Sequence, residues 1–173
     1  MKIAFTGHRP EGLPFGEDEA CEQCRMLKKM LWYEIKQRIG MGYDTFYCGA
    51  ARGSDIICGE LVLLMQPRVS VNLKLICVTP FKEQARGWSE QWQKRYERLL
   101  QNAFQVVQLS EHYYHGCYHT RDRYLVDHAD TVLAVYNGSS RGGTAYTVGY
   151  AYQKKKEIVV FDPFMLCRGI ISM

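Results

Sequence analysis

The chain has 173 residues, of which 47% are hydrophobic and 23% charged, and it carries a net charge of +4. This composition excludes a disordered or repetitive chain, and the length suits one domain with its own core. The mild positive charge favours anionic small molecules and gives no argument for nucleic acid. No apolar run approaches the ~20 residues of a membrane span, and positions 7–10 end the first apolar run before a signal-peptide core can form, so we expect a cytoplasmic protein.

Short apolar runs alternate with helical patterns along the chain. In chain order we expect a strand at 2–6, a helix at 20–39, a strand at 45–48, a helix at 54–65, a strand at 74–79, a helix at 88–102, a strand at 104–108, a helix at 118–128, a strand at 131–136, a helix at 143–155 and a strand at 158–161. Continuous apolar strands are typical of strands buried on both faces, and strand–helix alternation favours a parallel sheet with helices on both sides. We therefore predict one α/β domain over residues 1–173, without a linker or an internal repeat.

Glycine-rich and polar segments follow five of the six expected strands. They read TGHRP (6–10), GAARGSD (49–55), TPFKEQ (79–84), YNGSSRGGT (136–144) and DPF (162–164). Ligands of open parallel sheets bind outside the carboxyl ends of the strands, near the point where the strand order reverses. The sequence therefore predicts a ligand site at this edge of the sheet.

The segment GAARGSD is the sharpest of these signals. Its small residues Gly49, Ala50 and Gly53 would let the backbone approach a ligand, and the helix that begins near Ser54 would offer unpaired N–H groups. Arg52 could bind a phosphate or carboxylate, and Asp55 could cap the helix or bind a ribose hydroxyl. The competing interpretation is a tight structural turn with Ser54 as N-cap. The segment matches neither a P-loop nor a G-x-G-x-x-G fingerprint.

The other segments add further candidates. Gly142, Gly143 and Thr144 form a second glycine-rich turn before a helix, or a flexible loop. In the first segment, Gly7 would let the backbone approach the ligand, while donors would come from Thr6, His8 and Arg9. The remaining candidates are Thr79, Pro80, Phe81 and Arg121. Phe81 either stacks on a base or fills the core, and Arg121 either contacts the ligand or is solvated. We interpret His8 as a contact or positioning residue, and its role as a base stays open.

The seven cysteines are an odd number and several lie inside apolar runs, so buried reduced thiols explain them better than a disulfide framework. A zinc site needs four ligands. Candidate ligands occur in two separate segments: Cys21 and Cys24 in one, and His112, His115, Cys117 and His119 in the other. The sequence does not show that these segments meet, and we predict no metal site.

Several of these segments occur in an order that resembles the YpsA-like family of the SLOG superfamily, which also contains the DprA/Smf proteins and the LOG cytokinin-activating enzymes. The matching segments are TGHRP, GAARGSD, TPFKEQARGW, the stretch 121–130 and GGT, and the resemblance covers residues 2–162. It implies a three-layer α/β/α Rossmann-like domain with about six strands in the order 3-2-1-4-5-6. It also implies a pocket for a nucleotide or nucleotide-derived ligand, such as an ADP-ribose-like or NAD-related molecule, in a sensor or regulator. No other cofactor is implied, and a homodimer is left open.

The resemblance leaves two alternative functions. LOG enzymes hydrolyse the N-glycosidic bond of a nucleoside monophosphate, and Arg121, Gly142 and Gly143 match parts of their motifs. Gly149 stands where their glutamate should be, which disfavours this chemistry unless Asp55 or Glu83 substitutes. DprA-like binding of nucleic acid is disfavoured because basic residues are dispersed apart from the run 154–156.

Overall fold

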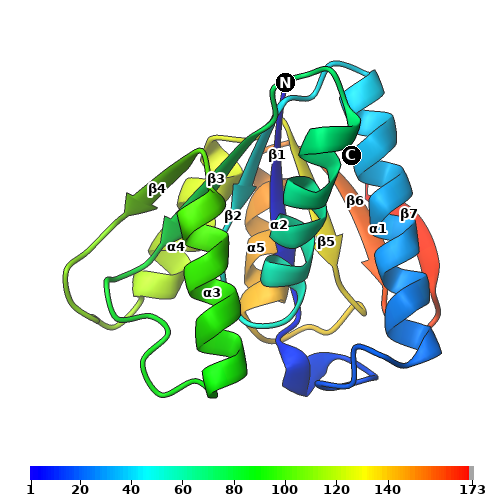
Figure 1. Cartoon of the computed structure of the whole chain (residues 1–173). Helices are drawn as coiled ribbons and strands as arrows, with labels where there is room; N and C mark the ends of the chain where they lie inside the picture. The colour runs from blue at the N-terminus through cyan, green and yellow to red at the C-terminus, as the bar shows by residue number, and fades with distance from the viewer. Residues whose placement is uncertain (172–173) are drawn as a thin grey trace.

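The structure is a computed structural model that describes residues 1–171. Its centre is a single sheet of seven strands in the order β4-β3-β2-β1-β5-β6-β7 (Figure 1). The strands are β1 (Lys2–Gly7), β2 (Thr45–Cys48), β3 (Lys74–Thr79), β4 (Gln105–Gln108), β5 (Thr131–Val135), β6 (Glu157–Asp162) and β7 (Cys167–Ile171). β1 to β6 pair in parallel, and β7 is antiparallel to β6.

Five α-helices cover the two faces of the sheet (Figure 1). They are α1 (Glu22–Gly40), α2 (Ser54–Met65), α3 (Glu90–Asn102), α4 (Cys117–Asp127) and α5 (Gly143–Gln153), with short 3-10 helices η1 (Pro10–Gly12) and η2 (Gln66–Arg68). α1, α2 and α3 pack on one face, and α4 and α5 pack on the other. The predicted three-layer Rossmann-like α/β fold is confirmed.

The order of the strands differs from the expected one at β4. β4 lies outside β3 at the edge of the sheet, whereas the expected order placed it beside β1. Three successive crossovers through α1, α2 and α3 keep to one face, so each carries the chain one strand further outward. α4 then returns the chain across the opposite face to β5, beside β1. The reversal point therefore falls between β1 and β5. The tail adds the seventh strand, β7, to the six expected.

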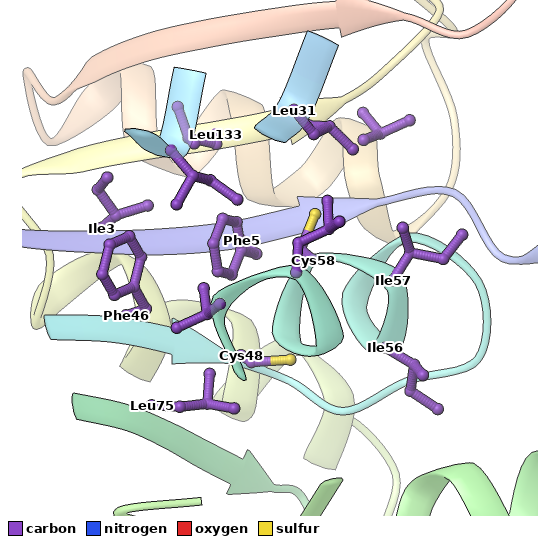
Figure 2. Close-up of a cluster of buried hydrophobic side chains, with 14 of the residues drawn as sticks. Ile3, Phe5, Leu31, Phe46, Cys48, Ile56, Ile57, Cys58, Leu75 and Leu133 are labelled. Atoms are coloured by element: carbon purple, nitrogen blue, oxygen red, sulfur yellow. The ribbon is translucent and has the colours of Figure 1, made fainter. Parts of the chain in front are cut away.

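Alternating side chains of the central strands supply two separate cores. Ile3 and Phe5 of β1 face α1 to α3, where Phe5 stacks on Phe46 with 5.9 Å between ring centroids (Figure 2). Ala4 faces α4 and α5 instead, in a core made mainly of aliphatic residues. Burial on both faces fixes the register of β1 and therefore the position of the turn that follows it.

All seven cysteines are free, as expected from the sequence. Cys167 is exposed, Cys21 is half-buried and the other five are buried. Burial raises the pKa of Cys24 to about 11, which suppresses the reactive thiolate.

We therefore expect a thiol reagent to label Cys167 quickly and Cys21 more slowly, and the five buried thiols only after denaturation. Stopped-flow absorbance with an aromatic disulfide reagent measures these phases. Cys167→Ser should remove the fast phase alone. Labelling of more than two thiols in the native protein would contradict this distribution.

Candidate functional site

The carboxyl end of β1 borders a cavity of about 490 Å³. Its walls come from the turn after β1, the start of α2, one face of α4 and the N-terminal turn of α5. This is the reversal point of the strand order, where the sequence predicted a site.

The predicted site residues separate into two groups. Those that line the cavity are Thr6, Gly7, His8, Arg9, Asp55, Arg121, Gly142, Gly143 and Thr144. Those that do not line it are Gly49, Ala50, Arg52, Gly53, Thr79, Pro80 and Phe81. The structure thus brings TGHRP, RGGT and the start of the Arg121 helix together, whereas most of GAARGSD lies behind the wall.

A buried arginine between two carboxylates forms the floor of the cavity. Arg121 is 5% exposed, its Nε donates to Asp122 Oδ1 at 2.8 Å, and its Nη1 lies 3.5 Å from Asp55 Oδ2. Nη1 also donates to the carbonyl of Gly49. Within the described chain, no hydrogen bond involves Nη2 of Arg121. The guanidinium is therefore fixed on one side and keeps a donor for a ligand.

The missing side chain of Gly49 makes room for this arginine. A Cβ at position 49 would lie 1.8 Å from Arg121 Nη1 and 2.6 Å from Asp55 Oδ2. Gly49 therefore leaves space for the side chain of Arg121, whereas the sequence suggested that its backbone approaches the ligand directly. Gly7 has a similar structural role, because its Cβ would lie 2.5 Å from the Cβ of Ser54 in α2.

Burial governs the ionisation of Asp55. Its pKa is raised from 3.8 to about 6, chiefly because burial penalises the charged carboxylate, while Arg121 opposes the rise and Asp122 adds to it. Ala51 N donates to Asp55 Oδ2 at 3.4 Å. A carboxyl group that changes charge near neutral pH thus lines the cavity.

The two helix N-termini at the cavity differ in whether their N–H groups are occupied. At α2, Gly53 is the N-cap, and Ser54 donates to the carbonyl of His8 through both N and Oγ, at 3.1 and 2.9 Å. At α5, no acceptor is found within residues 1–171 for the N–H of Gly143 or Thr144, and both line the cavity. Of these two helix ends, α5 is therefore the one whose first two N–H groups both lack an acceptor within the described residues, and such helix ends can bind anions.

His8 lies at the rim, and its ring is held in place. Nε2 lies 2.9 Å from Asn137 Oδ1, and the ring lies against Tyr136. Partial burial lowers the pKa of His8, so the imidazole is mostly neutral at pH 7. These contacts fix the orientation of the ring beside the cavity, and the role of His8 toward a ligand stays a prediction.

Arg52 and Phe81 are bound to other parts of the protein. Arg52 Nη2 donates to Glu11 Oε1 at 2.7 Å, and its guanidinium lies 6.0 Å from the Trp88 ring centroid. Phe81 is buried and contacts the ring of Tyr118. Neither side chain lines the cavity.

Known proteins resemble this chain along nearly its whole length. A family model described as "YspA SLOG family" matches residues 3–163. The chain belongs to the YpsA-like family of the SLOG superfamily. UPF0398 proteins of Bacillus thuringiensis (strain Al Hakam) and Bacillus cereus (strain AH187) are each 28% identical over 167 residues, which cover 95% of this chain and 89% of theirs.

A solved structure shares the fold of this YpsA-like chain. It is DNA processing protein A from Helicobacter pylori, described as binding single-stranded DNA, with a TM-score of 0.64 and 18% sequence identity. The match covers 92% of this chain and 64% of that one, so this chain spans less than two thirds of the DprA chain. At this identity the match shows the fold alone.

Several residues that line the cavity were not predicted as site residues. The most informative are Tyr118, Asp122 and Leu125, which share one face of α4 with Arg121. Helical spacing of three and four residues from Arg121 could have identified Tyr118 and Leu125. Arg141 and Glu11 also line the cavity, but they gave no such signal, because Arg141 lies in a loop and Glu11 in the three-residue helix η1.

Metal binding and membrane insertion leave no signature in the described residues. Within residues 1–171, no group of three or more His, Cys, Asp or Glu side chains is arranged to hold a metal ion. Cys21 instead caps α1, accepting from Cys24 N at 3.4 Å. None of the helices in this range has the length and apolar character needed to cross a bilayer.

Proposed function

We propose that the cavity binds a nucleotide or nucleotide-derived ligand, and that the protein acts as a sensor or regulator of that ligand. The observation that carries this proposal is that two kinds of anion-binding group line one cavity: the free N-terminus of α5 and the guanidinium of Arg121. A phosphate group at α5 would accept from the N–H groups of Gly143 and Thr144.

The charges of the cavity favour a nucleotide over a bare polyanion. Three cations, Arg9, Arg121 and Arg141, line the cavity together with three acidic residues, Glu11, Asp55 and Asp122. Carboxylates repel additional phosphates but accept hydrogen bonds from hydroxyls, as acidic residues do for ribose in Rossmann folds. A molecule with a phosphate group and a ribose diol can bind both the cationic and the acidic residues.

The test compares binding of a nucleoside 5′-monophosphate, the matching nucleoside and inorganic phosphate by isothermal titration calorimetry. We expect the monophosphate to bind most tightly. Arg141→Ala should weaken it about tenfold, the loss of one charge-assisted hydrogen bond, and should leave nucleoside binding unchanged. Arg86→Ala is the matched control, because Arg86 is exposed and lies outside the cavity. No saturable binding of any nucleoside monophosphate by the folded protein would refute the proposal.

Hydrolysis of an N-glycosidic bond is a second candidate, favoured by Asp55 and Asp122. These carboxylates stand in the cavity although the LOG-type glutamate is replaced by Gly149, which lies outside it. Asp55 has a pKa of about 6, which suits proton transfer near neutral pH. Steady release of free base from a nucleotide, abolished by Asp55→Asn, would establish this activity in place of simple binding.

Single-stranded DNA belongs in the same panel of ligands, because the DprA structure that shares this fold is described as binding it. DNA binding would differ from nucleotide binding in its dependence on salt, since each neutralised phosphate releases counterions. A steep loss of affinity with rising salt would support DNA as the ligand.

A further inference from the structure

A row of aromatic rings leads out of the cavity. Tyr118 lines the cavity, and its ring centroid lies 5.9 Å from that of Phe81 in an edge-to-face contact. Phe81 makes a second edge-to-face contact with Tyr113, at 5.6 Å. Each step is therefore shorter than 6 Å, and the row connects the wall of the cavity to the loop between β4 and α4.

The last ring of the row is open to solvent and yet held in place. Tyr113 is 63% exposed, whereas Phe81, which contacts its ring, is only 9% exposed. The loop around it is closed by Ser110, whose Oγ donates to the carbonyl of His112 at 2.8 Å, and by Cys117 N, which donates to the carbonyl of Tyr114 at 3.1 Å. An exposed aromatic ring on an ordered support can stack on a nucleic acid base at little entropic cost.

A cation stands at the junction between the cavity and this row. Arg9 is exposed, lines the cavity, and its guanidinium carbon lies 5.3 Å from the centroid of the Tyr118 ring. Stacking on Tyr118 restricts the orientation of the guanidinium but leaves its N–H edge available to a phosphate.

We infer that Tyr113, supported by Phe81, is a second base-binding subsite, so that the ligand carries two bases joined through phosphate at Arg9. The inference rests on the proposed function, which assigns the first nucleotide to the cavity. It specifies the ligand class as a dinucleotide, linked either by a 5′–5′ pyrophosphate or by a 3′–5′ phosphodiester.

The experiment measures the affinity of the full chain for AMP, NAD⁺ and the dinucleotide ApA by calorimetry. We expect at least one of the two dinucleotides to bind more tightly than AMP, and the preferred one identifies the linkage. Tyr113→Ala should weaken that dinucleotide by about 5- to 150-fold, the range for loss of one base–aromatic stack, and should leave AMP unchanged. Tyr113→Phe should retain the affinity, because the ring and not the hydroxyl does the stacking.

Tyr33→Ala is the matched control, since Tyr33 is 55% exposed on α1 and does not line the cavity. Equal effects of Tyr113→Ala on AMP and dinucleotide, or no effect on either, would overturn the second subsite while leaving the cavity proposal intact. If the wild-type protein binds neither AMP nor either dinucleotide, the proposed function itself is refuted. A decanucleotide that binds more than tenfold tighter than ApA would replace the dinucleotide with a longer strand.

Discussion

Arg121→Met should lower the free energy of unfolding by about 3–5 kcal/mol at pH 7.5, as expected when one partner of a buried ion cluster is removed. Arg121 is the cation between Asp55 and Asp122, both of which are less than 10% exposed. Methionine fills a similar space but leaves two carboxylates facing each other without a counter-charge. Urea denaturation monitored by circular dichroism measures the loss.

Arg123→Met provides the matched control for this prediction. Arg123 lies on the same helix, α4, but it is exposed and does not line the cavity, so we expect a change within about 0.5 kcal/mol. The loss in Arg121→Met should shrink at pH 5, where Asp55 is largely protonated and the repulsion is relieved. A loss below about 1 kcal/mol at pH 7.5 would mean that the carboxylates do not depend on Arg121.

The fold could be predicted largely from the alternation of strands and helices, because that pattern requires parallel strands and right-handed crossovers. The position of β4 could not, since nothing in the run 105–108 specifies whether it pairs with β3 or with β1. That choice depends on α3 packing on the same face as α2, a tertiary contact through Leu99 and Gly59. β7 was not expected because Cys167–Ile171 pairs with β6 through backbone hydrogen bonds and is mostly exposed.

The cavity could be located from the sequence, but the roles of its glycines could not. A glycine after a strand gives the same sequence pattern whether a ligand, a helix or a side chain occupies the space that a Cβ would fill. At Gly7 that space faces Ser54, and at Gly49 it faces Arg121. The occupation of the α2 N-terminus could likewise not be predicted. Ser54 at the start of α2 donates to the carbonyl of His8, which lies 46 residues away from it in sequence.

The pH dependence of stability should carry the signature of Asp55. Its pKa is about 6 in the folded protein and 3.8 when unperturbed, so between these values the folded state binds more protons than the unfolded state. The free energy of unfolding therefore falls as pH rises through this window, by about 3 kcal/mol in total, of which about half falls between pH 5 and pH 8. This penalty is fully relieved only below about pH 4.

Comparison with Asp55→Asn isolates this contribution from other titrating groups. Both proteins share the other groups whose pKa values are shifted. The lowered pKa of His8 makes the fold more stable as pH rises, opposite to Asp55. The paired carboxylates of Glu19, Glu34 and Glu157 have lowered pKa values that stabilise the fold at neutral pH. We expect the difference in unfolding free energy, wild type minus variant, to decrease by about 1.5 kcal/mol from pH 5 to pH 8. A difference that does not change with pH would place the pKa of Asp55 outside this window, and the carboxyl group would then keep one charge state throughout ligand binding.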